Sequence, residues 1–93
     1  MAGTEFEAIG SFPSMVTSKV IYMDNTTIYT AKLTAGYNNT IQFELSADNG
    51  ANWEIVTPNV RHTFTNTGTQ LKWRAVGAYP SIINWLKVEY HVY

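Results

Sequence analysis

The chain contains no cysteine, and only 14% of its 93 residues are charged. Without cysteine there are no disulfide bonds, no Cys-based zinc sites and no thiol catalysis. Lys and Arg are few and scattered and the net charge is −1, so a basic stripe for nucleic acid is missing. The sequence also lacks an apolar run of the roughly 20 residues that span a membrane, and its start is unlike a signal peptide. We therefore expect no nucleic-acid partner, no membrane partner and synthesis in a cytoplasm.

Helical periodicity is missing as well, whereas residues typical of β-proteins are frequent. The chain has three Trp, six Tyr and four Phe, and Thr, Asn and Ser provide most of its polar surface. Aromatic and β-branched residues are enriched in strands. A chain of this length forms one domain with a thin core, in which each aromatic ring buries about 150–250 Å².

Alternation of apolar and polar residues is the strongest signal, since it places one face of a strand in a core and the other in solvent. The clear alternating segments are 27–35, 40–47, 70–77 and 86–93, whose apolar positions include Tyr29, Leu33, Phe43, Trp73 and Val88. Weaker segments are 19–23, 53–57 and 60–65, with turn signals at 24–25, 58–59 and 66–68. Residues 6–12 fit a further strand or an arm, and 81–85 fit the start of the last strand or one helical turn.

These segments predict an all-β fold, because turn signals recur about every 8–12 residues, as in sandwiches and small barrels. We expect an antiparallel β-sandwich, jelly-roll or immunoglobulin-like, with about seven to eight strands. Residues 1–17 are expected to form an N-terminal arm or edge strand, and residues 18–93 the sandwich domain.

The stretch SADNGANW, residues 46–53, predicts a tight hairpin turn. Asn and Gly tolerate positive φ, and the Asp carboxylate can accept hydrogen bonds from backbone N–H groups of the turn. The spacing of Ser46, Asp48, Gly50 and Trp53 resembles the Asp-box hairpin of sialidases and other β-proteins, with Asn52 where Thr is usual. That resemblance implies a structural role for the four residues. The alternative is a calcium site formed by oxygen atoms of Asp48, Asn49, Asn52 and Glu54, although calcium usually requires more carboxylates.

The second half of the chain carries a longer pattern, formed by the hairpin followed by segments 53–57, 62–68, 71–75 and 80–90. These segments read WEIVT, HTFTNTG, LKWRA and PSIINWLKVEY. As a set they resemble a small β-domain of structural proteins from tailed phages and prophages. The resemblance covers just over half of the chain and implies a β-sandwich within a virion or a cell-surface-binding protein.

The candidates for catalysis do not form a recognisable set. A Ser nucleophile would need a His and an acid brought together with it, but both histidines lie in expected strands and no Gly-x-Ser-x-Gly elbow is present. His62 reads as a strand residue bonded to a neighbour, and His91 as solvated or at an interface. A glycosidase would require two acids facing each other across a cleft. Alternation instead places Glu44, Glu54 and Glu89 toward solvent. We therefore expect no enzyme, cofactor or metal site.

Two functions of different classes remain. The first is a virion structural protein, either a capsid decoration (head-stabilising) protein or a tail or fibre subunit, which binds other virion proteins and itself as a homo-oligomer. The alternative is a carbohydrate-binding module that recognises host surface glycans, with loops 37–39 and 77–79 as candidate contacts. For either function, aromatic residues are the candidate contacts, because Tyr and Trp are enriched at interfaces. These candidates are Tyr22, Tyr37, Tyr79, Trp85 and Tyr93.

Overall fold

The computed structural model of the chain describes residues 2–7, 9–12, 15–18, 20–38, 40–77 and 81–92. These residues form an antiparallel all-β fold, as the alternating pattern predicts, and none of them is helical. The strands are β1 (Ala2–Glu7), β2 (Gly10–Phe12), β3 (Met15–Thr17), β4 (Tyr22–Asn38), β5 (Ile41–Ser46), β6 (Glu54–Val56), β7 (Arg61–Gly77) and β8 (Ser81–Val92).

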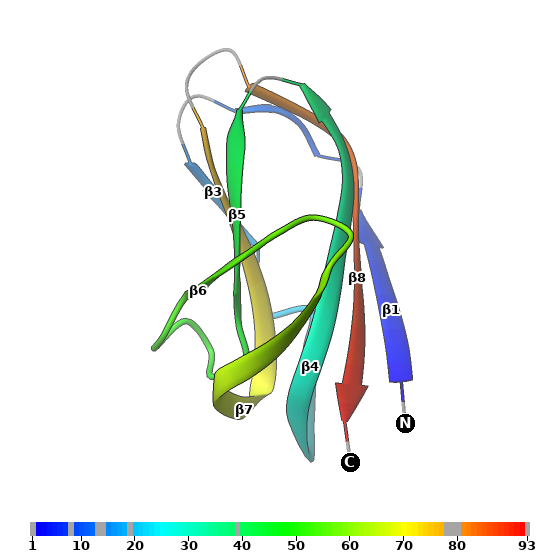
Figure 1. Cartoon of the computed structure of the whole chain (residues 1–93), viewed down its shortest axis with the longest axis vertical. Coiled ribbons are helices and arrows are strands. Elements are labelled where there is room, and N and C mark those ends of the chain that lie inside the picture. The colour runs from blue at the N-terminus through cyan, green and yellow to red at the C-terminus, as the bar shows by residue number, and fades with distance from the viewer. Residues whose placement is uncertain are drawn as a thin grey trace.

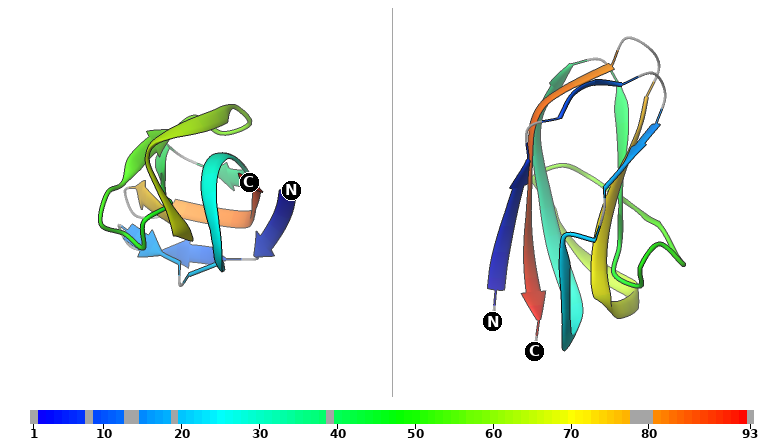
Figure 2. Two further views of the ribbon diagram at one scale, coloured as in Figure 1. Left: turned by 90° about the horizontal axis from the view of Figure 1, so that it is seen from below. Right: turned by 180° about the vertical axis from the view of Figure 1, so that it is seen from behind.

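One 8-stranded sheet, with the strand order β1-β8-β4-β7-β5-β6, folds over on itself to give two layers. The fold-over occurs along β7, since residues 61–68 pair with residues 28–32 of β4 and residues 72–77 pair with β5 and β3. We call β1, β2, β8, residues 28–38 of β4 and residues 61–68 the β8 layer. We call β3, residues 70–77, β5 and β6 the β5 layer. Figures 1 and 2 show β7 curling at the lower end of the molecule and returning upward in the other layer.

The length of β4 and β7 departs from the sequence prediction. Segments 19–23 and 27–35 were expected as separate strands around a turn at 24–25, and this separation is wrong, because both contribute to β4. The expected break at 66–68 is likewise a bend inside β7. The two strands bend together, since Met23 pairs with Gln70 and Ile28 with Gly68, with an irregularity of register between them. Pairing on both sides of the bend keeps the backbone groups hydrogen-bonded, so a turn signal produces a bend instead of a break.

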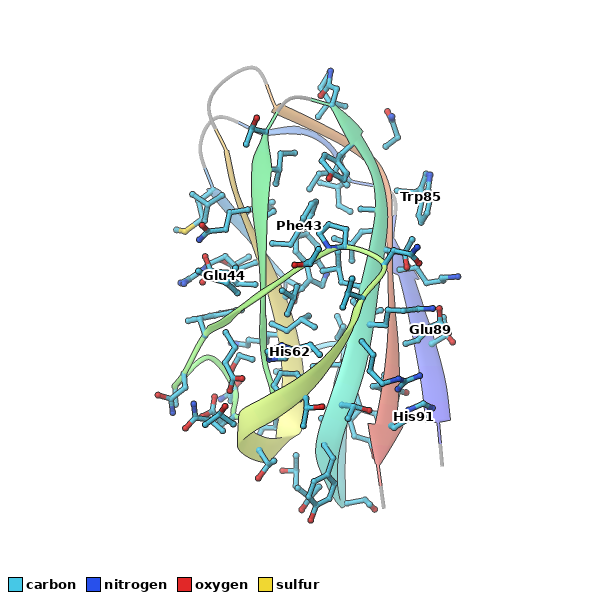
Figure 3. All side chains as sticks on the ribbon, in the orientation of Figure 1. Phe43, Glu44, His62, Trp85, Glu89 and His91 are labelled. Atoms are coloured by element: carbon cyan, nitrogen blue, oxygen red, sulfur yellow. The ribbon has the colours of Figure 1, made fainter. Side chains whose placement is uncertain are left out.

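The core lies between the layers. Leu33, Phe43, Trp73 and Val88 are all buried, as alternation predicts, and Figure 3 shows Phe43 in the interior between the sheets. The complete buried apolar cluster is Ile28, Ala31, Leu33, Ile41, Phe43, Leu45, Ala47, Val56, Phe64, Leu71, Trp73, Ala75, Ile83, Leu86 and Val88. Both layers contribute to it, and burial of this set is the main favourable term in folding.

Three residues depart from the simple alternation. Tyr29 was expected in the core but is exposed, because β4 changes register between Ile28 and Thr30 and Ile28 is buried instead. Glu44 and Ser46 were expected on the solvent side, yet both are buried. Neighbouring side chains and the adjacent hairpin cover them. Burial of these polar groups would be unfavourable without hydrogen bonds to their oxygen atoms.

The first seventeen residues, where described, contribute strands to both layers. β1 and β2 pair with β8, and β3 pairs with β7. Beyond β3, the backbone of Ser18 and Ile21 continues along β7 through hydrogen bonds with Trp73 and Leu71. At the other end of the chain, residues 81–85 begin the last strand and do not form a helical turn.

Candidate functional site

The side chains of Ser46, Asp48 and Asn52 form hydrogen bonds within the 46–53 hairpin. Asp48 Oδ1 accepts hydrogen bonds from Ser46 Oγ at 2.7 Å and from the backbone N–H of Asn52 at 2.9 Å. Its other oxygen accepts from Asn52 Nδ2 at 2.7 Å. Ser46 Oγ in turn accepts from the backbone N–H of Gly50 at 2.8 Å. Both oxygens of the Asp48 carboxylate therefore bond to groups of the turn itself.

The backbone and electrostatics of the hairpin agree with this arrangement. Asn49 and Gly50 have φ of 61° and 86°, the left-handed region that Asn and Gly tolerate. The indole of Trp53 lies 3.5 Å from where a Cβ on Gly50 would be, so it covers the turn. Burial alone would raise the pKa of Asp48, but hydrogen bonds from Asn52 and Ser46 outweigh burial and lower it. The carboxylate is therefore held in its charged form.

Glu54 forms a second polar cluster, which joins the two layers. Its carboxylate accepts from His62 Nε2 at 2.8 Å, from the backbone N–H groups of Thr65 and Asn66 at 3.0 and 2.8 Å, and from Asn66 Nδ2 at 3.2 Å. The ring of His62 also packs edge-on against Phe64. Burial alone would raise the pKa of Glu54, and these hydrogen bonds lower it below its ordinary value. Glu54 thus faces β7, so the sequence expectation that it points to solvent is wrong.

The sequence carries no clear signal for this cluster. Glu54 and Asn66 lie 12 residues apart, and only the return of β7 beside β6 brings them together. The cluster also separates Glu54 from the other residues of the calcium alternative, because its carboxylate bonds to β7 while Asp48 bonds within the turn.

Arg74 and Glu44 form an ion pair on the outer side of the β5 layer. They are directly opposite in the β5–β7 register, and Arg74 Nη2 lies 2.6 Å from Glu44 Oε1. The guanidinium also lies over the ring of Trp53, 4.3 Å from its centroid, which is a cation–π contact. The pair explains why Glu44 tolerates burial.

The outer side of the β8 layer carries an aromatic and polar row. Trp85, Lys87, Glu89 and His91 alternate outward along β8, and Figure 3 shows Trp85, Glu89 and His91 on the same side of the molecule. Glu89 Oε1 lies 3.4 Å from Lys87 Nζ and 4.0 Å from Lys32 Nζ. The end of the row has one further contact group, which consists of His91, Arg61 and Thr30.

The aromatic residues expected as contacts do not gather at one place. Tyr22 packs against the core with its ring 4.5 Å from that of Tyr90. Tyr37 is exposed and meets Phe43 edge-on at 5.0 Å. Trp85 lies on the outer side of the β8 layer, opposite Gly36. Tyr79 and Tyr93, and with them most of the loop 77–79, lie outside the described residues.

The two histidines and the carboxylates of the described residues fall into separate clusters. His62 and His91 are on different clusters, and neither makes a hydrogen bond with a serine hydroxyl in the part of the chain that the structure describes. Among the described residues, no group of three or more His, Asp or Glu side chains is placed to hold a metal ion. The two outer surfaces differ in their side chains: the outer side of the β5 layer has exposed apolar residues, and the outer side of the β8 layer carries Trp85.

Comparisons with models of protein families, with curated proteins and with solved structures give no match for this chain. No helix of the described residues has the length and apolarity needed to cross a membrane.

Proposed function

We propose that the chain is a non-enzymatic structural protein of a tailed-phage virion, either a capsid decoration protein or a tail or fibre subunit. The observation that carries the proposal is the apolar character of the outer side of the β5 layer. Met15, Ile55 and Val76 are 53%, 66% and 36% exposed, and all three point outward from this layer. We call these three residues the apolar face.

Strand register places Met15 beside Val76, with Ile55 on the other side of β5. Met15 on β3 pairs with Val76 on β7, which also pairs with Gln42 on β5. Two residues farther along β5 from Gln42, Glu44 pairs with Ile55 on β6. Large exposed apolar side chains on one side of a small sandwich favour contact with another protein, because their burial is favourable.

The charges of Arg74 and Glu44, within the same surface, compensate each other. The ion pair of Arg74 and Glu44 lies between Ile55 and Thr17, where β7 and β5 run side by side. A paired and hydrogen-bonded charge can be buried against a partner at a lower cost than a single charge. Arg and Trp side chains are also typical of the centres of protein interfaces, and here Arg74 stacks on Trp53.

The sequence pattern supports the assignment to a virion. The segments that resemble phage structural proteins supply core residues such as Trp73 and Val88 and also residues of the outer surface, including Ile55 and Arg74. The same pattern therefore contains both the fold and the surface on which the proposed function depends.

The experiment is mass spectrometry of phage particles purified by density gradient from the strain that encodes the chain. We expect the chain to be present at a fixed copy number relative to the major capsid or tail protein. Electron microscopy with a labelled antibody would then locate it on the head, the tail or a fibre. Absence of the chain from the purified particles would overturn the proposal.

Two matched variants test the role of the apolar face. Val76→Asp puts a charge at its centre, and we expect incorporation into particles to fall at least tenfold, since an unpaired charge would be buried. Thr63→Asp is the control, because it adds the same charge to an exposed position in the other half of β7. Equal incorporation of both variants would count against this surface, provided that both purify as folded proteins.

A further inference from the structure

The 46–53 hairpin contains a pair of residues with a reaction of its own. Asn49 is the only one of the eight asparagines in the chain that is followed by glycine. In an Asn-Gly pair the backbone nitrogen of glycine can attack the side-chain carbonyl carbon of asparagine, because glycine has no side chain to hinder the approach. The new N–C bond closes a succinimide ring, the bond to the side-chain nitrogen breaks, and ammonia leaves. Water then opens the ring and leaves aspartate or isoaspartate at this position.

The attacking nitrogen is held by a hydrogen bond in the folded protein. Asn49 itself is exposed, so its side-chain amide meets water. A backbone amide, however, is a weak nucleophile until its N–H proton is removed. The N–H of Gly50 donates to Ser46 Oγ at 2.8 Å, and Ser46 is 0% exposed. The proton that must leave therefore points at a buried hydroxyl group instead of at solvent.

The hydroxyl group of Ser46 is oriented to keep this proton in place. A serine hydroxyl has one proton to donate and lone pairs with which to accept. Ser46 donates its proton to Asp48 Oδ1 at 2.7 Å, which leaves its lone pairs for the N–H of Gly50. Asp48 could draw the Gly50 proton away through Ser46 only if its carboxylate were a strong base. The hydrogen bonds that lower the pKa of Asp48 make the carboxylate a weaker base, so this relay is unfavourable.

The backbone around Asn49 is fixed as well. Asn49 has a φ of 61°, its N–H donates to the carbonyl oxygen of Gln70 at 3.0 Å, and the N–H of Ala51 donates to that of Asp48 at 3.2 Å. Ring closure requires the backbone between Asn49 and Gly50 to rotate until the nitrogen faces the side-chain carbon, and such reactions depend strongly on alignment. Rotation of this peptide would disturb the hydrogen bonds on both of its sides.

We propose that Asn49 is a site of spontaneous conversion to isoaspartate and aspartate, and that the Ser46 hydroxyl keeps this reaction slow by holding the N–H of Gly50. Isoaspartate lengthens the backbone by one carbon at the residue whose N–H bonds to Gln70 of β7. Conversion therefore loosens the hairpin from β7, next to the bend at Gly68. The inference is independent of the proposed virion role, because it concerns the isolated chain.

Incubation of the full chain for several weeks at mildly alkaline pH tests the proposal, with mass spectrometry of proteolytic peptides to measure conversion at each asparagine. The comparison is the same protein unfolded in guanidinium chloride, in which Asn49 should be the first asparagine to convert. We expect conversion of Asn49 in the folded protein to be at least about tenfold slower, because the reacting groups are held out of alignment. Equal rates in the folded and unfolded protein would overturn the proposal.

Variants separate the role of the hydroxyl group from a general loosening of the hairpin. Ser46→Ala should accelerate conversion of Asn49 in the folded protein at least about fivefold, since the N–H of Gly50 loses its acceptor. Ser46→Cys fills a similar space with a much weaker acceptor and should also accelerate it, so the test remains if Ser46→Ala fails to fold. Asn52→Ala is the matched control, because it removes the 2.7 Å hydrogen bond to Asp48 and leaves that of Ser46 with Gly50.

We expect Asn52→Ala to convert at about the rate of the unmodified protein. Conversion in Ser46→Cys as slow as in the unmodified protein would show that the hydroxyl group does not protect Asn49. Equal acceleration in Asn52→Ala and the Ser46 variants would assign the protection to the rigidity of the hairpin as a whole, which also contradicts the proposal.

Discussion

Glu54 and Asn66, which are 12 residues apart in the chain, are joined twice: the Glu54 carboxylate accepts the backbone N–H of Asn66 at 2.8 Å and its side-chain Nδ2 at 3.2 Å. Glu54 belongs to β6, at the end of the strand order in the β5 layer, whereas Asn66 belongs to the half of β7 in the β8 layer. The contact therefore links the two layers next to the bend of β7. Figure 1 shows the first half of β7 running down to the bend at the lower end of the molecule, with β6 to its left.

The first prediction concerns the stability that Glu54 contributes. Glu54→Ala leaves two backbone N–H groups and the ring of His62 without their acceptor, and we expect the free energy of unfolding to fall by about 2–3 kcal/mol. Urea denaturation of the purified protein measures the change. Glu89→Ala is the control, since this side chain is 39% exposed and its ion pairs with Lys87 and Lys32 lie at the surface, so we expect a loss below about 1 kcal/mol. Equal losses for the two variants would show that Glu54 does not link the layers.

The second prediction concerns acid. The pKa values of Asp48 and Glu54 are lowered in the folded protein, because hydrogen bonds outweigh the effect of burial. Their unfolded-state values are about 3.9 and 4.3. A lowered folded-state pKa stabilises the protein fully above the unfolded value, and this contribution is lost as the pH falls through the folded value. We expect stability to be constant between about pH 5 and pH 7 with respect to these groups and to decrease below about pH 5.

Thermal unfolding followed by circular dichroism between pH 7 and pH 2.5 checks the acid prediction. The double variant Asp48→Asn with Glu54→Gln should be less stable at neutral pH and should lose less stability on acidification than the unmodified protein. A double variant with an unchanged acid dependence would assign that dependence to other carboxylates.

The third prediction concerns the bend of β7. A Cβ on Gly68 would lie 2.2 Å from the carbonyl oxygen of Ala47 and 2.9 Å from the Cα of Asp48. Both neighbours are backbone atoms, so Gly68→Ala forces the hairpin and β7 apart. We expect a loss of at least about 2 kcal/mol, or failure to fold, whereas Thr67→Ala at the neighbouring exposed position should cost less than about 0.5 kcal/mol. A stable Gly68→Ala protein in urea denaturation would show that the approach of the two segments is loose.

The fourth prediction concerns a buried hydroxyl group. The Tyr22 oxygen is buried and has no hydrogen-bond partner among the described residues, while its ring packs against Tyr90. Burial of an unpartnered polar group is unfavourable, so Tyr22→Phe should leave the free energy of unfolding unchanged or raise it by up to about 1 kcal/mol. Tyr22→Leu removes the ring contact and should destabilise the protein. A clear loss of stability in Tyr22→Phe would reveal a partner for this hydroxyl.

Local sequence signals predicted much of the fold. Alternation identified the strands that hold Phe43, Trp73 and Val88, because a period of two depends only on neighbouring residues. It failed at Tyr29, where a change of register places Ile28 in the core, and a register change depends on the partner strand. It also failed at Glu44, which is covered by an ion pair with a residue that is 30 positions away.

Turn signals behaved in a similar way. Asp48, Asn49 and Gly50 form a hairpin whose side-chain hydrogen bonds connect residues at most four positions apart, so this part of its chemistry is readable locally. The signal at 66–68 marked a real change of direction, but the residues remain within β7, because β4 follows the same bend and keeps its pairing. The chain alone does not reveal which strand will accompany a bend.

By itself the sequence determined the all-β character, the antiparallel two-layered core and the local hairpin, because these follow from side-chain periodicity and from the backbone preferences of a few adjacent residues. The tertiary structure alone decided that Glu54 links the layers and that Arg74 forms its ion pair with Glu44. It also decided that Trp85 lies against Gly36 on the side away from the core. Each of these contacts joins residues far apart in the chain, and strand order and register, which set such contacts, depend on the packing of the whole domain.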